Sequence, residues 1–220
     1  MKFPSVRTAL AGAALAAALA GCSSSAPPRY YTLSVPAADA APRVQAGYLI
    51  DVLPVSVPAQ ADQPQLMVRT EEGSVAALYG ERWAAPLAEE IRDALSDALK
   101  RDLGALDVRT VKPAANAPVW RVQADVQGFD LVAGSRAQLD ATWRVRPLNT
   151  AGEGRLCRSL VVENVDGEGA PALVAAQRRA VAALAGAMAA AIRGGTEDAG
   201  SSVRTLGCTA LPRAQGENPA

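Results

Sequence analysis

Residues 120–145 read WRVQADVQGFDLVAGSRAQLDATWRV, and this stretch decides the fold class. In its first part apolar and polar side chains alternate, as they do on a β-strand with one buried and one solvated face. Ala133-Gly134-Ser135 is typical of a turn, and the same alternation resumes from Ala137 to Val145. The alternation changes phase at Gly128, which indicates a β-bulge. The stretch therefore predicts two antiparallel strands that share an apolar face.

Shorter apolar segments on both sides of this pair predict further strands. Glu71-Glu72-Gly73 predicts the turn of a hairpin, with Gly supplying the conformational freedom that the turn needs. The predicted strands are Tyr30–Leu33, Tyr48–Val57, Gln65–Thr70, Ser74–Leu78, Asp107–Val111 and Leu156–Val162.

Two segments have the periodicity of helices. In residues 85–103, leucines and Ile91 recur every four residues, and the charged side chains, Glu90 and Arg92 among them, are expected on the opposite, solvated face. A second helix is expected from Pro171 to about Arg193, where Gly194-Gly195 ends it. The element order β-β-β-β-α-β-β-β-β-α predicts a single α+β domain, a largely antiparallel sheet with both helices packed on one face.

The N-terminus has the three parts of a lipoprotein signal peptide. Lys2 and Arg7 give a positive start, residues 9–20 form a short apolar core, and Leu19-Ala20-Gly21-Cys22 ends it. We expect cleavage after residue 21 and acylation of Cys22, palmitate included. A cysteine buried in the protein core is the alternative, but the Ser/Pro-rich residues that follow are typical of a tether. The expected division is signal 1–21, lipidated cysteine and tether 22–29, domain 30–195 and flexible tail 196–220.

The residue after Cys22 favours the outer membrane. Ser23 stands where an aspartate would commonly signal retention in the inner membrane, so we expect an anchor on the periplasmic face of the outer membrane. The seven residues from Ser23 to Arg29 reach at most roughly 25 Å. The domain must therefore stay close to its membrane.

Two cysteines, Cys157 and Cys208, remain after lipidation. An even number of thiols in an oxidising compartment favours a disulfide. The alternative is that the two are unrelated small apolar residues.

Composition argues against several classes of function. The chain has no histidine, which removes the commonest general base and the usual metal ligand. It also has no phosphate-binding glycine loop and no metal-spaced carboxylate cluster, so we expect no catalysis, no metal and no cofactor. The chain has 22 basic and 22 acidic residues, and loss of Lys2 and Arg7 with the signal leaves 20 against 22, a formal charge of −2. Nucleic acid is therefore not an expected partner.

Four segments together resemble the PqiC-type ABC-transport auxiliary lipoproteins. They are the strand-forming Gln65–Thr70, the Glu81–Leu87 stretch ERWAAPL, the Tyr30–Leu33 stretch YYTL just after the tether, and Gly128-Phe129-Asp130. The resemblance covers roughly residues 29–193. It implies that the chain is the outer-membrane component of an MCE-type system, in which an ABC transporter and a periplasmic MCE-domain protein move lipids between membranes.

Two other functions stay open: a carrier that encloses lipid in its own cavity, and a pilotin-like assembly lipoprotein of another envelope machine. A ring-shaped MCE partner would favour a homo-oligomer. Arg69, Arg82 and Trp83 are the candidate partner contacts. Trp83 could instead be a core anchor, and the two arginines could simply pair with Glu71, Glu72 or Glu81.

Overall fold

The computed structural model describes residues 26–35, 46–70, 73–195 and 200–212. The signal peptide and Cys22 lie outside these residues. Within them the chain forms eight strands and two helices: β1 (Arg29–Tyr31), β2 (Leu49–Val52), β3 (Gln65–Arg69), β4 (Val75–Trp83), α2 (Leu87–Leu103), β5 (Val119–Val132), β6 (Arg136–Leu148), β7 (Gly154–Asn164), α3 (Gly169–Ile192) and β8 (Val203–Leu211).

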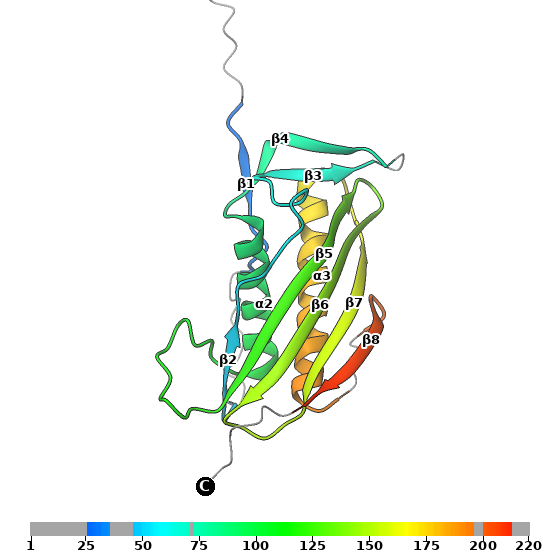
Figure 1. Cartoon of the computed structure of the whole chain (residues 1–220). Coiled ribbons are helices and arrows are strands. Elements are labelled where there is room, and N and C mark those ends of the chain that lie inside the picture. Colours follow the sequence, from blue (N-terminus) through cyan, green and yellow to red (C-terminus); the bar gives the residue numbers. More distant parts are fainter. Residues whose placement is uncertain (1–25, 36–45, 71–72, 196–199, 213–220) are drawn as a thin grey trace, which may run out of the picture.

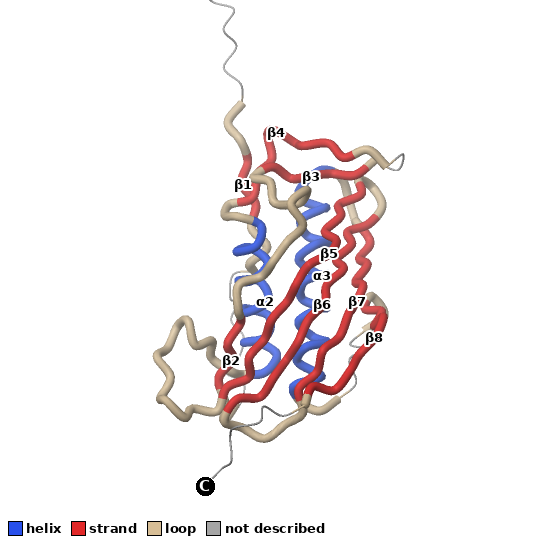
Figure 2. The backbone as a smooth tube through the Cα atoms, in the orientation of Figure 1, coloured by secondary structure: helices blue, strands red, loops and turns tan. Residues whose placement is uncertain are grey.

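The strands form one mixed sheet in the order β1-β4-β3-β5-β6-β7-β8, and β2 pairs in parallel with β5. The pairs from β5 to β8 and the β3–β4 hairpin are antiparallel. Both helices cover the same face of the long strands, as Figure 1 and Figure 2 show. The predicted single α+β domain, a largely antiparallel sheet with two helices on one face, is confirmed.

The alternation in residues 120–145 gives the sheet its buried face. Val122 and Ala124 of β5 and Trp143 and Val145 of β6 are almost completely buried, while their neighbours along each strand are not. The register shifts between Val126 and Gly128, where the phase change predicts a bulge. The shift lets the last part of β5 keep pairing with β6 after the side chains change faces.

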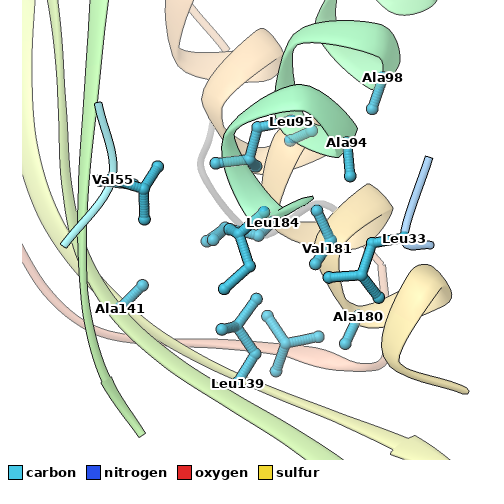
Figure 3. Close-up of a cluster of buried hydrophobic side chains, with 14 of the residues drawn as sticks. Leu33, Val55, Ala94, Leu95, Ala98, Leu139, Ala141, Ala180, Val181 and Leu184 are labelled. Carbon is cyan, nitrogen blue, oxygen red and sulfur yellow. The ribbon is translucent and has the colours of Figure 1, made fainter. Parts of the chain in front are cut away.

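The layer between helices and sheet combines alanines with larger apolar side chains. Ala180 and Val181 of α3 lie beside Leu33, and Leu184 points toward Leu139 of β6 (Figure 3). Leu95, Leu139 and Leu184 are fully buried. Alanines let the backbones approach closely, so the larger side chains fill the remaining space.

The structure differs from the sequence prediction in the tail and in one strand. Residues 203–211 of the supposedly flexible tail form β8, which pairs with β7, so that part of the prediction is wrong. The turn before Val203 brings the chain back along β7, whose edge would otherwise lie unpaired. The strand expected at 107–111 is only a bridge between Asp107 and Ile50, because the backbone turns there and Thr110 N–H donates to Asp107 O.

Candidate functional site at the tether end of the domain

The four segments that carry the family resemblance meet at one end of the domain. β1 and β4 pair in parallel, with Tyr31 beside Trp83. β3 reaches the end of β5, where Arg69 pairs with Val132. Figure 1 shows β1, β3 and β4 crossing above the long strands, at the end from which the N-terminal segment leaves. We call this region the tether end.

An ion pair fastens the first residue of β1. The guanidinium of Arg29 bonds to the carboxylate of Glu81 on β4. The hydrogen bond from Arg29 is the main cause that lowers the pKa of Glu81 below its ordinary value of 4.5. Burial, followed by a hydrogen bond with Glu81, raises the pKa of the neighbouring Tyr31. Tyr31 is partly buried and packs against the core, whereas the side chain of Tyr30 is 62% exposed.

Glu90 of α2 holds the residues that follow β1. One of its carboxylate oxygens accepts hydrogen bonds from Thr32 Oγ1 and Leu33 N–H, both over 2.7 Å, and the other accepts one from Ala85 N–H over 3.1 Å. Arg178 of α3 donates two hydrogen bonds to Thr32 O, at 2.8 and 2.6 Å. The segment that links the tether to the domain is thus bound to both helices.

The solvated position expected for Glu90 is wrong, since the residue is 5% exposed. The helical period puts it on the polar face, but Leu33 and Thr32 of the incoming chain cover that face. A carboxylate so buried is tolerated because it accepts three hydrogen bonds, two of them from backbone N–H groups. Its partners Thr32 and Leu33 lie in the YYTL stretch, which carries part of the resemblance.

Trp83 is a core anchor. It is 4% exposed, and its ring meets that of Phe129 edge to face with the centroids 5.9 Å apart. This contact joins ERWAAPL to the Gly128-Phe129-Asp130 stretch of β5. The side chain of Trp83 therefore offers no surface to a partner, and the partner contact considered from the sequence is wrong for this residue.

Arg69 connects the hairpin to the main sheet. Its Nε and Nη2 lie 2.7 and 2.6 Å from Asp130 Oδ1, so Asp130 is its ion-pair partner. The side chain is about one-third exposed and lines a groove of about 390 Å³. Gln60, Ala61, Gln63, Met67, Val75, Phe129 and Asp130 complete the lining.

Arg82 lies on the outer part of the tether end. It is the register partner of Tyr30 and is partly exposed. Its Nε is buried and has no hydrogen-bond partner among the described residues, and no ion pair to a described carboxylate is formed. Glu81 next to it bonds to Arg29 instead.

Comparisons with known proteins agree with this grouping of motifs. Residues 31–189 match the family described as the ABC-type transport auxiliary lipoprotein component. The chain belongs to this family. The match begins at Tyr31, the last residue of β1, and ends within α3, so it covers the tether end except for Arg29 and Tyr30. No curated protein matches the sequence.

Two solved structures are similar to this lipoprotein. A crystal structure titled only as an uncharacterised protein has a TM-score of 0.58 at 16% identity, covering 74% of this chain and 97% of the other. A Xanthomonas campestris protein of family DUF330 has a TM-score of 0.45 at 19% identity, covering 73% of this chain and 89% of its own. The first supports the fold only.

A second polar cluster is buried beside the middle of α2. Arg92 Nη2 lies 2.5 Å from Asp107 Oδ2, Ser96 Oγ donates to the same oxygen over 2.6 Å, and Arg92 Nε donates to Val52 O. The side chains of Arg92 and Asp107 are 7% and 1% exposed. This cluster joins α2, β2 and the 105–110 turn, and the expectation of a solvated Arg92 is wrong.

Cys157 and Cys208 lie opposite each other on β7 and β8. Their Cα atoms are 4.1 Å apart and the sulfurs 2.00 Å apart. Cys157 is buried and Cys208 lies on the exposed edge strand. The geometry fits the disulfide predicted from the sequence, whose formation in the cell remains a prediction.

The described residues hold no group of three or more His, Cys, Asp or Glu side chains placed to bind a metal. Among the described helices, none is long and apolar enough to span a membrane.

Proposed function

We propose that this lipoprotein is the non-enzymatic auxiliary component of an MCE-type ABC system that moves lipids between the inner and outer membranes. Cys22 anchors it in the outer membrane, and the domain docks to the periplasmic MCE-domain protein. The observation that carries the proposal is the family match over residues 31–189. The short tether and the absence of histidine support it, because they suit a fixed docking module better than an enzyme or a mobile carrier.

The packed interior supports docking over the carrier alternative. A carrier needs an apolar cavity for acyl chains, but Leu95, Leu139 and Leu184 fill the space between helices and sheet. The groove beside Arg69 lies at the hairpin, and the Arg69–Asp130 ion pair forms part of its lining. An acyl chain there would displace water from two charged groups, which is unfavourable.

The groove suits a protein partner better. It combines Met67, Val75 and Phe129 with the amides of Gln60 and Gln63, a mixture of apolar and polar lining that is common in non-obligate interfaces. Arg69 is partly exposed there and can donate further hydrogen bonds. We therefore propose Arg69 as a contact for the MCE-domain protein.

The experiment is crosslinking and copurification from envelopes that contain the whole transport system. Arg69→Glu should reduce recovery of the MCE-domain protein by about tenfold, equivalent to about 1.4 kcal/mol. The matched control is Arg158→Glu, because Arg158 also pairs with an aspartate of a neighbouring strand, Asp140, on the exposed face of the sheet. The control should recover the partner normally.

A charge swap separates docking from folding. Arg69→Asp combined with Asp130→Arg keeps an ion pair between β3 and β5 but moves the cation, so it should restore thermal stability and not partner recovery. Equal recovery with Arg69→Glu and wild type would contradict the docking site. If the pure protein extracts lipid stoichiometrically and captures no envelope partner, the carrier function is correct instead.

The anchor is tested separately with Cys22→Ser. Without acyl chains the protein should leave the outer-membrane fraction or accumulate as an unprocessed precursor, since each buried CH₂ contributes about 0.8 kcal/mol to anchoring. Normal fractionation of this variant with the outer membrane would exclude Cys22 as the lipid site.

A further inference from the structure

The tether end exposes the side chains of two tyrosines. Tyr79 of β4 is 77% exposed and Tyr30 of β1 is 62% exposed, the highest fractions among the large hydrophobic side chains of the described residues. Val75, also on β4, is 48% exposed. Such side chains normally bury their rings when the fold allows it. Their exposure on adjacent strands therefore points to an external surface that covers them.

The chain itself brings these residues close to a membrane. Tyr30 is eight residues after Cys22, so its Cα lies at most roughly 28 Å from the acylated cysteine. β4 pairs with β1 and lies at the top of the domain in Figure 1, above the long strands. The surface that the tether can hold against these strands is the bilayer to which Cys22 is anchored.

The attachment of β1 fixes which face of the domain approaches the bilayer. The Arg29–Glu81 ion pair, the Glu90 bond to Leu33 N–H and the two Arg178 bonds to Thr32 O hold the chain from residue 29 to 33. The direction in which the chain enters the domain is therefore fixed from Arg29 on. The tether end is therefore the end nearest the bilayer, and β8 lies toward the opposite end of the domain (Figure 1).

The chemistry of this surface suits lipid headgroups. Tyrosine has an apolar ring and a polar hydroxyl, and it is enriched where hydrocarbon meets water. Arg82 lies beside Tyr30 and has no ion pair with a described carboxylate, so its guanidinium can bond to a lipid phosphate. We propose that Tyr30, Tyr79 and Arg82 rest in the headgroup layer and hold the domain in one orientation on its own membrane.

This inference rests on the lipid anchor and not on the transport partner. The test uses the mature lipoprotein in vesicles of phosphatidylethanolamine and phosphatidylglycerol that contain a phospholipid with a nitroxide near the headgroup. Tyr79→Trp places a fluorescent probe at the proposed contact. Leu206→Trp is the matched control, because Leu206 is 46% exposed on β8 at the far end. The emission of the wild-type protein is subtracted from that of each variant. The three native tryptophans are at most 4% exposed, so they lie away from the quencher.

Emission from Tyr79→Trp should fall by roughly twofold in the nitroxide vesicles while that from Leu206→Trp stays unchanged. Adding Tyr30→Ser and Arg82→Glu to Tyr79→Trp should remove most of this quenching. Equal quenching of both probes would mean that the domain tumbles on its tether, and no quenching of either would mean that it stands off the bilayer. Both results overturn the proposal. It is also overturned if adding the MCE-domain protein abolishes the quenching, because Tyr79 would then be a contact for that protein. If Tyr79→Trp shows no quenching but the protein still copurifies with the MCE-domain protein, the membrane contact is wrong and the proposed function stands.

Discussion

Glu90 of α2 accepts a hydrogen bond from the backbone N–H of Leu33 over 2.7 Å, although the two residues are 57 positions apart in the chain. The bond joins the first residues after the tether to the start of the helix pair. Arg178 of α3 also holds Thr32, so the segment that follows the tether is bonded to both helices. Residues 32–33 and the helix pair are therefore joined through one carboxylate and one guanidinium.

Removing the Glu90 carboxylate should destabilise the domain. Glu90→Ala leaves the N–H groups of Leu33 and Ala85 without acceptors, and we expect a loss of about 2–4 kcal/mol in the free energy of unfolding. Urea denaturation measures it. Glu89→Ala is the control: Glu89 is exposed one position earlier, and its replacement should change stability by at most about 0.5 kcal/mol. Similar losses for both variants would show that the three hydrogen bonds contribute little.

The buried pair of Arg92 and Asp107 should also be sensitive to the loss of one partner. Asp107→Ala leaves a guanidinium in an environment where the side chain is 7% exposed, at an expected cost of about 3–5 kcal/mol. Asp97→Ala breaks the Lys100–Asp97 pair, whose side chains are about one-third exposed, and should cost at most about 0.5 kcal/mol. The two variants are compared by denaturation under the same conditions. A cost for Asp107→Ala no larger than for Asp97→Ala would contradict the buried geometry.

Trp83 tests whether the tether end is a packed part of the core. Trp83→Ala should lower the free energy of unfolding by about 3–5 kcal/mol, because it leaves a cavity and removes the edge-to-face contact with Phe129. Tyr79→Ala on the same strand should be near neutral, since that side chain is exposed. Thermal melting of both variants checks the difference. A small effect at Trp83 would mean that the ERWAAPL segment is not anchored as described.

The elements with strong periodicity could be predicted from the sequence, and the polar contacts could not. Alternation predicts β5, β6 and the bulge at Gly128, because each depends on neighbouring residues only. Glu90 and Arg92 were expected in water because the helical period shows which side chains share a face, not which distant segment covers that face. β8 was missed because RTLGCTAL has little alternation. Its partner β7 and the facing Cys157 supply the stabilisation that its composition does not indicate.

Part of the candidate site could also be predicted from the sequence. The resemblance drew attention to four separate segments, and the structure brings all four together at the tether end. Arg69 and Arg82 are partly exposed there, as a contact requires. The burial of Trp83 and the pairing of Arg69 with Asp130 depend on the angle between hairpin and sheet, which periodicity does not determine.

The Arg29–Glu81 pair should make the docking of β1 depend on pH. A carboxyl whose pKa is lowered by folding contributes stability above its unfolded pKa, and this contribution is lost as the pH falls through the folded value. We therefore expect β1 to loosen as the pH falls below 4.5, the ordinary pKa of the Glu81 carboxyl. NMR titration of the Glu81 carboxyl measures the shift. Arg29→Gln should raise the Glu81 pKa toward 4.5, whereas Arg158→Gln should leave it unchanged; an unshifted Glu81 in wild type would exclude this role.

The Cys157–Cys208 bridge should keep the edge strand β8 on the sheet. Peptide mapping without reductant should find the two cysteines linked in periplasmic material, and free thiols at both positions would refute the bridge. The bond closes a loop with a sequence separation of 51, so in the chain-entropy model its loss should cost about 4 kcal/mol.

Cys157→Ala with Cys208→Ala removes the disulfide without placing a polar hydroxyl at the buried position 157. Hydrogen exchange of residues 203–211 should then rise while exchange in β5 and β6 stays slow, because most of β8 is exposed and Val203 is its one buried side chain. Protection of β8 equal to that of wild type would show that backbone pairing alone holds the strand.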